Sequence, residues 1–258
     1  MKERNKAIIN LLFLLLTLVV NTFGAIGLIN GYSQKEVSDM YLTLITPDPS
    51  TFSIWGVIYS LLIISCIIMI FKSQDSYYKN IINQISTLFI ISCVFNFLWI
   101  ISFSYLMLEI SVLFIFGILI SLSLILEKLL KANSKKNWLL PLTFGMYGGW
   151  LFIATVVNIA ATLVKLKWDG FGLSENIWAG IILIISIVLL LLVTTKNKNA
   201  VFPLPLAWAY LGIYRFLKSP VGFKGQFNIL QGCSFVGACV LLLVALFVFY
   251  KNEYKIIP

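Results

Sequence analysis

Side chains that could carry acid–base or metal chemistry are few in this chain. The sequence contains no histidine, so the commonest general base and the usual metal and haem ligand are missing. The four cysteines, Cys66, Cys93, Cys233 and Cys239, lie in apolar runs without a CxxC spacing, which argues against a zinc site or a disulfide framework. No pair of carboxylates lies within an apolar run, and this disfavours proton-coupled transport. The sequence therefore favours binding over catalysis and leaves an enzymatic role open.

Aromatic side chains recur at helical spacing and could bind a flat ligand. In the stretch TPDPSTFSIWGVIY, residues 46–59, Pro47 and Pro49 precede Phe52, Trp55 and Tyr59. Prolines belong before or at the first turn of a helix, so a helix should start near Phe52. Its three aromatic side chains then share one face.

Two later segments mix aromatic and polar residues in the same way. Asn96 and Trp99 share one helical stripe, and Trp150 and Asn158 share another. Lipid-facing surface has no need of asparagine, so these stripes should turn inward. Taken singly, the asparagines are more simply explained as hydrogen-bonding partners between helices. Taken together with Trp55, the tryptophans favour a pocket, because flat rings on converging helices are what a planar, mostly apolar ligand needs.

The remaining tryptophans fit other roles. Trp138, Trp168 and Trp178 lie near the ends of apolar segments, as is typical of side chains at the membrane interface. Trp208 follows a pair of prolines and fits either an interface or a core position.

Composition places all these residues in a membrane. Of 258 residues, 60% are hydrophobic and 11% are charged, and the mean hydropathy is +0.98. Soluble domains are only about 45–50% apolar. The 19 basic and 10 acidic residues lie in short clusters between apolar runs, so we expect no nucleic-acid partner. The predicted fold is an all-α integral membrane protein surrounded by lipid.

Eight apolar segments could position the aromatic residues across the bilayer. A span needs about 20 residues at about 1.5 Å each. The seventh segment is the weakest, because it is short and opens with two prolines. The predicted spans are 7–28, 53–71, 85–107, 110–130, 142–164, 177–195, 203–217 and 229–250.

The basic residues predict an orientation. If the eight spans alternate, the side that holds both termini carries 13 lysines and arginines, and the other side carries 6. Positive charge gathers on the cytoplasmic side of a membrane. We therefore expect a multi-pass protein of a bacterial cell membrane with both termini in the cytoplasm and the proline-bearing first loop outside.

The stretch at residues 46–59 resembles the first loop and second helix of the TspO/MBR family, the tryptophan-rich sensory or translocator proteins. NFLW, residues 96–99, is similar to the third helix of that family, and WLFIATVVN, residues 150–158, is similar to the fifth. Asp48 departs from the family pattern by separating the two prolines. The resemblance covers about residues 1–165 and implies a five-helix bundle there, which leaves residues 166–258 as three additional transmembrane helices.

The resemblance also implies a ligand, since members of the family bind porphyrins and, in animals, sterols. We predict a receptor- or sensor-like protein whose first loop covers an intramembrane pocket for a flat hydrophobic molecule. No cofactor is required, a porphyrin or haem is a candidate ligand, and a homodimer is a candidate assembly. The predicted ligand-binding residues are Pro47, Pro49, Phe52, Trp55, Tyr59, Asn96, Trp99, Trp150, Thr155 and Asn158.

Two other functions remain open. A transporter of small solutes or tetrapyrroles would use all eight helices, and its second set of spans would repeat the arrangement of the first. An enzyme that degrades tetrapyrroles has been proposed among relatives of the family. Such an enzyme would depend on aromatic side chains with oxygen or light, because the sequence shows no pairing of nucleophile and base.

Overall fold

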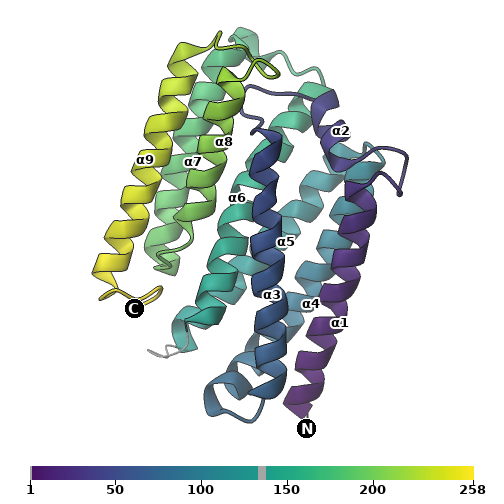
Figure 1. Ribbon diagram of the computed structural model, residues 1–258, viewed down its shortest axis with the longest axis vertical. Helices are drawn as coiled ribbons and strands as arrows, with labels where there is room; N and C mark the ends of the chain where they lie inside the picture. Colours follow the sequence, from purple (N-terminus) through teal and green to yellow (C-terminus); the bar gives the residue numbers. More distant parts are fainter. Residues whose placement is uncertain (1, 133–137) are drawn as a thin grey trace.

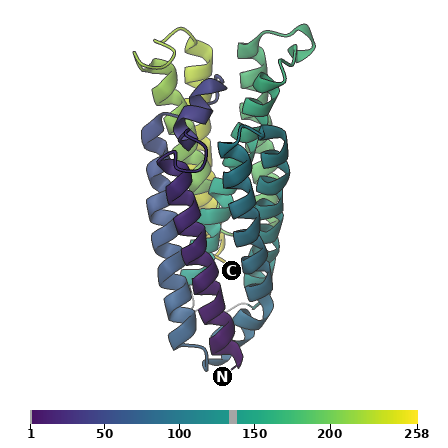
Figure 2. The ribbon, with the colours of Figure 1, turned by 90° about the vertical axis from the view of Figure 1, so that its right-hand side faces the viewer.

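A computed structural model describes residues 2–132 and 138–258 as helices that run along one long axis (Figures 1 and 2). Two of the lysines counted for the orientation, Lys135 and Lys136, lie outside the described residues. A short helix, α2, and two 3-10 helices, η1 and η2, lie between the longer ones. In chain order the elements are α1 (Lys2–Ala25), α2 (Gln34–Met40), η1 (Pro49–Ser53), α3 (Ile54–Phe71), α4 (Ser76–Ser104), α5 (Leu108–Ala132), α6 (Leu139–Lys165), η2 (Gly170–Gly172), α7 (Glu175–Asn197), α8 (Pro203–Lys218) and α9 (Asn228–Lys251).

The helices confirm an all-α, multi-pass membrane protein. Within the described ranges, seven helices are long and apolar enough to cross a bilayer. The seventh predicted span is also a helix, but α8 has only 16 residues, which is about 24 Å at about 1.5 Å per residue. Pro203 and Pro205 lie in its first turn, where a proline removes no helical hydrogen bond. Both termini lie toward the lower end of the molecule in Figure 1.

The start of α8 packs against glycines of α6. A Cβ added at Gly149 would lie 2.2 Å from the carbonyl oxygen of Phe202, and one at Gly145 would lie 2.6 Å from Oδ1 of Asn199. The side-chain amide of Asn199 also donates a 2.8 Å hydrogen bond to the carbonyl of Pro141. Small residues allow such close backbone approach between membrane helices. The short helix α8 therefore belongs to the interior of the bundle.

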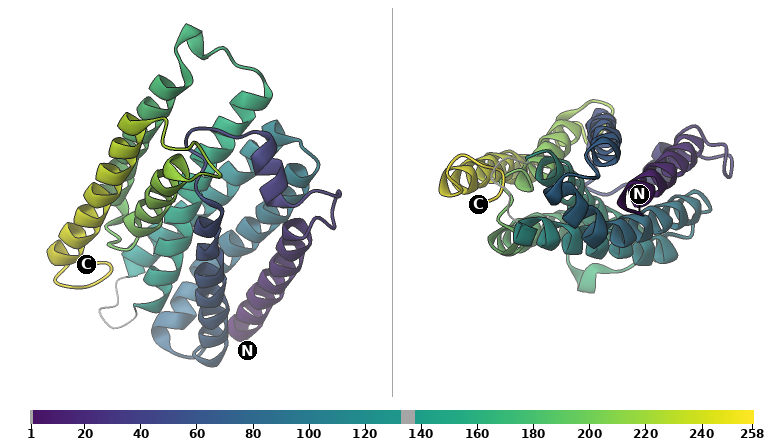
Figure 3. Two further views of the ribbon diagram at one scale, coloured as in Figure 1. Left: turned by 45° about the horizontal axis from the view of Figure 1, so that its top comes forward. Right: turned by 90° about the horizontal axis from the view of Figure 1, so that it is seen from below.

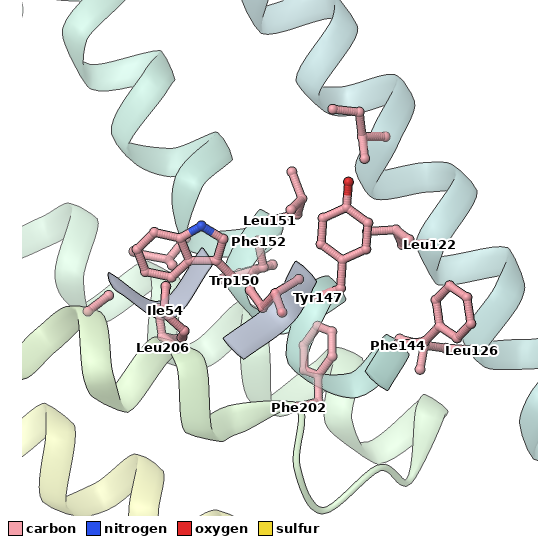
Figure 4. Packing of buried hydrophobic residues seen from close by; sticks show 14 of the residues in the cluster. Ile54, Leu122, Leu126, Phe144, Tyr147, Trp150, Leu151, Phe152, Phe202 and Leu206 are labelled. Carbon is pink, nitrogen blue, oxygen red and sulfur yellow. The ribbon is translucent and has the colours of Figure 1, made fainter. Parts of the chain in front are cut away.

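The larger of two hydrophobic core clusters among the described residues crosses the predicted boundary at residue 165. It contains Trp150 of α6 together with Leu206 and Tyr210 of α8, and Figure 4 shows side chains of both helices within it. The Tyr210 hydroxyl donates a 2.5 Å hydrogen bond to the carbonyl of Leu183 on α7. Seen from below, α1 and α9 lie at opposite ends of the elongated bundle (Figure 3). The division into residues 1–165 and 166–258 stays a prediction, and α8 packs across it.

Candidate ligand-binding pocket

The first loop contains a helix that the sequence analysis did not predict. α2 begins after Ser33, whose hydroxyl accepts a hydrogen bond from the backbone of Glu36, while the Glu36 carboxylate accepts one from the backbone of Ser33. This capping box has the signature Ser-x-x-Glu, which residues 33–36 carry. The bond from the Ser33 backbone is the main cause that lowers the pKa of Glu36. The cap fixes where α2 starts, and α2 lies at the upper end of the bundle in Figure 1.

The proline pair precedes a long apolar helix, as predicted. Asp48 caps η1, because its Oδ1 atom accepts a 3.0 Å hydrogen bond from the backbone of Ser50. The Ser50 hydroxyl also donates to this carboxylate at 2.6 Å. Hydrogen bonds from Ser50 hold the pKa of Asp48 below its ordinary value, and Arg215, 4.0 Å away, adds to the effect. α3 then starts at Ile54, two residues from the expected start.

A cavity of about 420 Å³ lies beneath the first loop, among α1, α3, α4 and α6. This volume falls within the roughly 300–1,000 Å³ of small-molecule sites. Eight of the ten predicted ligand-binding residues line it, and ligand binding by them remains a prediction. These eight are Pro47, Pro49, Phe52, Trp55, Tyr59, Trp99, Trp150 and Asn158.

The aromatic side chains of the cavity pack against one another. Trp55 stacks on Tyr59 with ring centroids 5.0 Å apart and an interplanar angle of 17°. Trp150 meets Trp55 edge-on at 6.0 Å and 84°, and it meets Phe52 at 6.0 Å and 88°. Aromatic pairs prefer these stacked and edge-to-face arrangements. The rings therefore hold each other in place, and one wall of the cavity is formed without a ligand.

Two tryptophans on the cavity keep an unused hydrogen-bond donor. Trp99 and Trp150 are only 8% and 2% exposed. Their indole N–H groups are buried and have no acceptor among the residues that the structure describes. An unpaired buried donor costs about 1–3 kcal/mol. Because protein atoms cover both N–H groups, the cavity meets these two residues through the rest of their rings.

The other two predicted residues, Asn96 and Thr155, do not line the cavity. Asn96 is fully buried and accepts a 2.6 Å hydrogen bond from Asn21 while donating one of 3.4 Å to the Tyr147 hydroxyl. The Tyr59 hydroxyl donates to Asn21 at 2.9 Å. This polar network joins α1, α3, α4 and α6. The Thr155 hydroxyl donates to a backbone carbonyl one turn earlier in α6.

Asn158 combines a place on the cavity with a structural bond. Its side-chain amide donates to Ser111 of α5 at 3.0 Å. The simpler explanation for the asparagines, hydrogen bonding between helices, therefore agrees with the contacts of both Asn96 and Asn158. In membranes, such a bond contributes about 0.6 kcal/mol on average.

The cavity also has lining residues that the sequence analysis missed. Gln34, Lys35 and Ser38 come from α2, and Ala209 comes from α8. The capping box could have revealed α2. No sequence pattern could have brought Ala209 to the pocket, because its position depends on how α8 packs. Lys35 is the one charged side chain among the described lining residues, and it forms an ion pair with Asp39 at the next turn of α2.

The tryptophans assigned to the interface behave differently from one another. Trp138 is 61% exposed. Trp168 and Trp178 pack with ring centroids 4.9 Å apart and line a second cavity of about 350 Å³ between the first loop, α6 and α7. Trp208 is 38% exposed, and its indole donates a 2.9 Å hydrogen bond to the Thr51 carbonyl in η1.

Comparison with known proteins extends the range of the resemblance. A family model described as TSPO-like protein matches residues 7–248. The matched range includes α7 and α8 and nearly all of α9, which lie beyond the first 165 residues. No curated protein and no solved structure matches the chain. The ligand of the cavity must therefore be argued from its geometry.

Proposed function

The chain belongs to the TSPO-like protein family, and from this premise we propose that it is a receptor- or sensor-like membrane protein that binds a flat, largely apolar ligand beneath its first loop. The family indicates a membrane protein of the sensor or transporter type. A porphyrin is the ligand we propose to test first.

The observation that carries the proposal is the aromatic wall of the cavity. Trp55 and Trp150 present ring surfaces at right angles to one another, and Trp99 lines the cavity from α4. Aliphatic side chains of Ile153 and Val157 complete the interior. The polar side chains of α2 supply a rim. A molecule with a flat apolar body and polar substituents at one edge matches this apolar interior and polar rim.

The region below the cavity supports binding over transport. The polar network of Asn21, Asn96 and Tyr147 lies there. Further along the same helices, Leu14 of α1 and Leu62 of α3 are almost fully buried, at 1% and 2% exposed. Packed apolar side chains offer no polar route to a solute. These residues favour a pocket that is closed toward the end of the molecule that holds the termini.

The proposal is tested by titrating purified protein in detergent with protoporphyrin IX and following its absorbance. The variants Trp55→Phe, Trp99→Phe and Trp150→Phe should each lose about twofold to tenfold in affinity, because a stacked ring pair is worth about 0.5–1.5 kcal/mol beyond burial. Trp138→Phe, at an exposed position, is the matched control and should bind normally.

Melting temperatures separate binding from folding in this test. Trp99→Phe and Trp150→Phe remove no hydrogen bond from the free protein, because neither indole N–H has an acceptor in the described chain. Both variants should therefore fold. Unchanged affinity in folded variants of all three pocket tryptophans, or an equal loss in Trp138→Phe, would contradict the proposal.

A further inference from the structure

We infer that α8 is a positioning element for the ligand pocket and holds the lid segment, which we define as Pro47–Phe52, over the cavity. The inference rests on the proposed function for its connection to a ligand. It gives the C-terminal part of the chain a role in the site.

Two hydrogen bonds connect the lid segment to α8. The backbone N–H of Asp48 donates to the carbonyl of Gly212 at 3.1 Å. The indole N–H of Trp208 donates to the carbonyl of Thr51 at 2.9 Å. Arg215 adds an attraction, with its guanidinium 4.0 Å from the Asp48 carboxylate. The three residues of α8 are spaced by four and three, so they share one face of the helix.

The two backbones approach each other at a glycine. A Cβ added at Gly212 would lie 2.1 Å from Oγ1 of Thr51, 2.8 Å from its Cγ2 and 2.9 Å from its Cβ. Thr51 is 1% exposed, so its side chain has no free space into which to turn. Any larger residue at position 212 must push the lid segment and α8 apart.

The lid segment is part of the cavity wall. Pro47, Pro49 and Phe52 line the cavity, and Ala209 of α8 lines it as well. Phe52 is also the ring that meets Trp150 edge-on. A shift of the lid segment away from α8 therefore changes the aromatic wall against which a ligand would pack. This geometry couples α8 to the pocket.

The test uses a readout that needs no ligand. Hydrogen exchange, followed by mass spectrometry, should be faster in the peptide that covers residues 46–54 in Gly212→Ala than in the wild type. In the same variant, affinity for protoporphyrin IX should fall about twofold to tenfold, as for the loss of a hydrogen bond. Gly232→Ala on α9 is the matched control, because a Cβ there meets no atom within 4 Å. It should change neither quantity.

A rescue variant distinguishes positioning from general damage. Adding Thr51→Ala to Gly212→Ala removes Oγ1 and Cγ2, the two atoms closest to the new Cβ, and leaves the Thr51 Cβ at 2.9 Å, so the exchange of the lid segment should return part of the way to the wild-type rate. Trp208→Phe is a second, milder variant that keeps a ring and loses the bond to Thr51. It decides the question if Gly212→Ala fails to fold.

The outcomes for the two proposals are separable. Unchanged exchange in residues 46–54 of folded Gly212→Ala and Trp208→Phe would overturn the positioning role, whatever binds in the pocket. Faster exchange combined with a wild type that binds no porphyrin would support positioning by α8 and contradict the proposed function.

Discussion

Asn21 on α1 donates a 2.6 Å hydrogen bond to Oδ1 of Asn96 on α4, and this pair lies at the floor of the aromatic cavity. Asn21 touches the cavity, whereas Asn96 does not. The amide of Asn21 also donates to the carbonyl of Thr17 within α1. Asn21 thus both lines the cavity and bonds to another helix, whereas Asn96 only bonds between helices. Helical spacing in the sequence could not distinguish these two roles.

The first prediction is that Asn21 and Asn96 are energetically coupled. In a double-mutant cycle with Asn21→Ala and Asn96→Ala, the coupling in the free energy of unfolding should lie between the average of about 0.6 kcal/mol and the maximum of about 1.7 kcal/mol found for membrane hydrogen bonds. Asn83 is an exposed asparagine on α4, the helix that also contains Asn96. It is the control and should show no coupling to Asn21. Asn96→Ala should reduce porphyrin affinity less than Trp150→Phe does. A larger loss would place Asn96 on the ligand.

The second prediction concerns haem. The cavity offers no histidine, cysteine or methionine among its described lining residues, and its one tyrosine hydroxyl donates to Asn21. Iron in a bound haem would thus gain no strong axial ligand from this wall. Haem and protoporphyrin IX should bind with affinities within a fewfold of each other. A low-spin, six-coordinate haem spectrum with much tighter binding would show that the ligand lies elsewhere or in another pose.

The third prediction is the orientation in the membrane. In a background with Cys233 and Cys239 replaced by alanine, an impermeant maleimide should label Lys224→Cys from outside intact cells. Gln74→Cys, in the loop between α3 and α4, should react only after permeabilisation. Both positions are exposed and lie in loops at opposite ends of the bundle. The reverse pattern would place the lysine-rich side outside and contradict the charge argument.

The fourth prediction is a pH effect at Asp48. Its pKa is lowered in the folded protein, mainly by hydrogen bonds from Ser50. The carboxylate therefore contributes stability above the ordinary pKa range of aspartate, and that contribution is lost as pH falls through the lowered value. Asp48→Asn keeps a capping oxygen but does not titrate. The difference in melting temperature between the two proteins should be steady near neutral pH and should narrow in acid.

Arg215→Gln serves as the comparison for the pH effect. It removes a charge that is 4.0 Å away and ranks behind the Ser50 hydrogen bonds as a cause of the pKa shift. When Asp48→Asn is made in the Arg215→Gln background, the difference in melting temperature that it causes should still narrow in acid, but by a smaller amount. If the melting temperatures of the wild type and Asp48→Asn differ by the same amount at all pH values, the lowered pKa of Asp48 is contradicted.

The sequence predicted the aromatic half of the pocket because the residues are local. Trp55 and Tyr59 stand four apart, and helical geometry alone puts them on one face. The sequence could not decide between Asn96 and Asn158 as wall residues, since both lie on inward stripes and only the rotation of each helix decides which side chain reaches the cavity. The contribution of Ala209 depends on contacts between α8 and η1, and no single helix contains that information.

During synthesis, the lid segment is made long before the part of α8 to which it bonds. The indole of Trp208 and the carbonyl of Thr51, which are joined in the folded protein, are 157 residues apart in the sequence. At about 5–20 residues per second, a ribosome needs on the order of 8–30 s to add that much chain. During this interval the first five long helices can already be inserted while the lid segment lacks its anchor on α8. Until α8 is made, the lid segment therefore lacks the hydrogen bonds that Gly212 and Trp208 form with it in the folded protein.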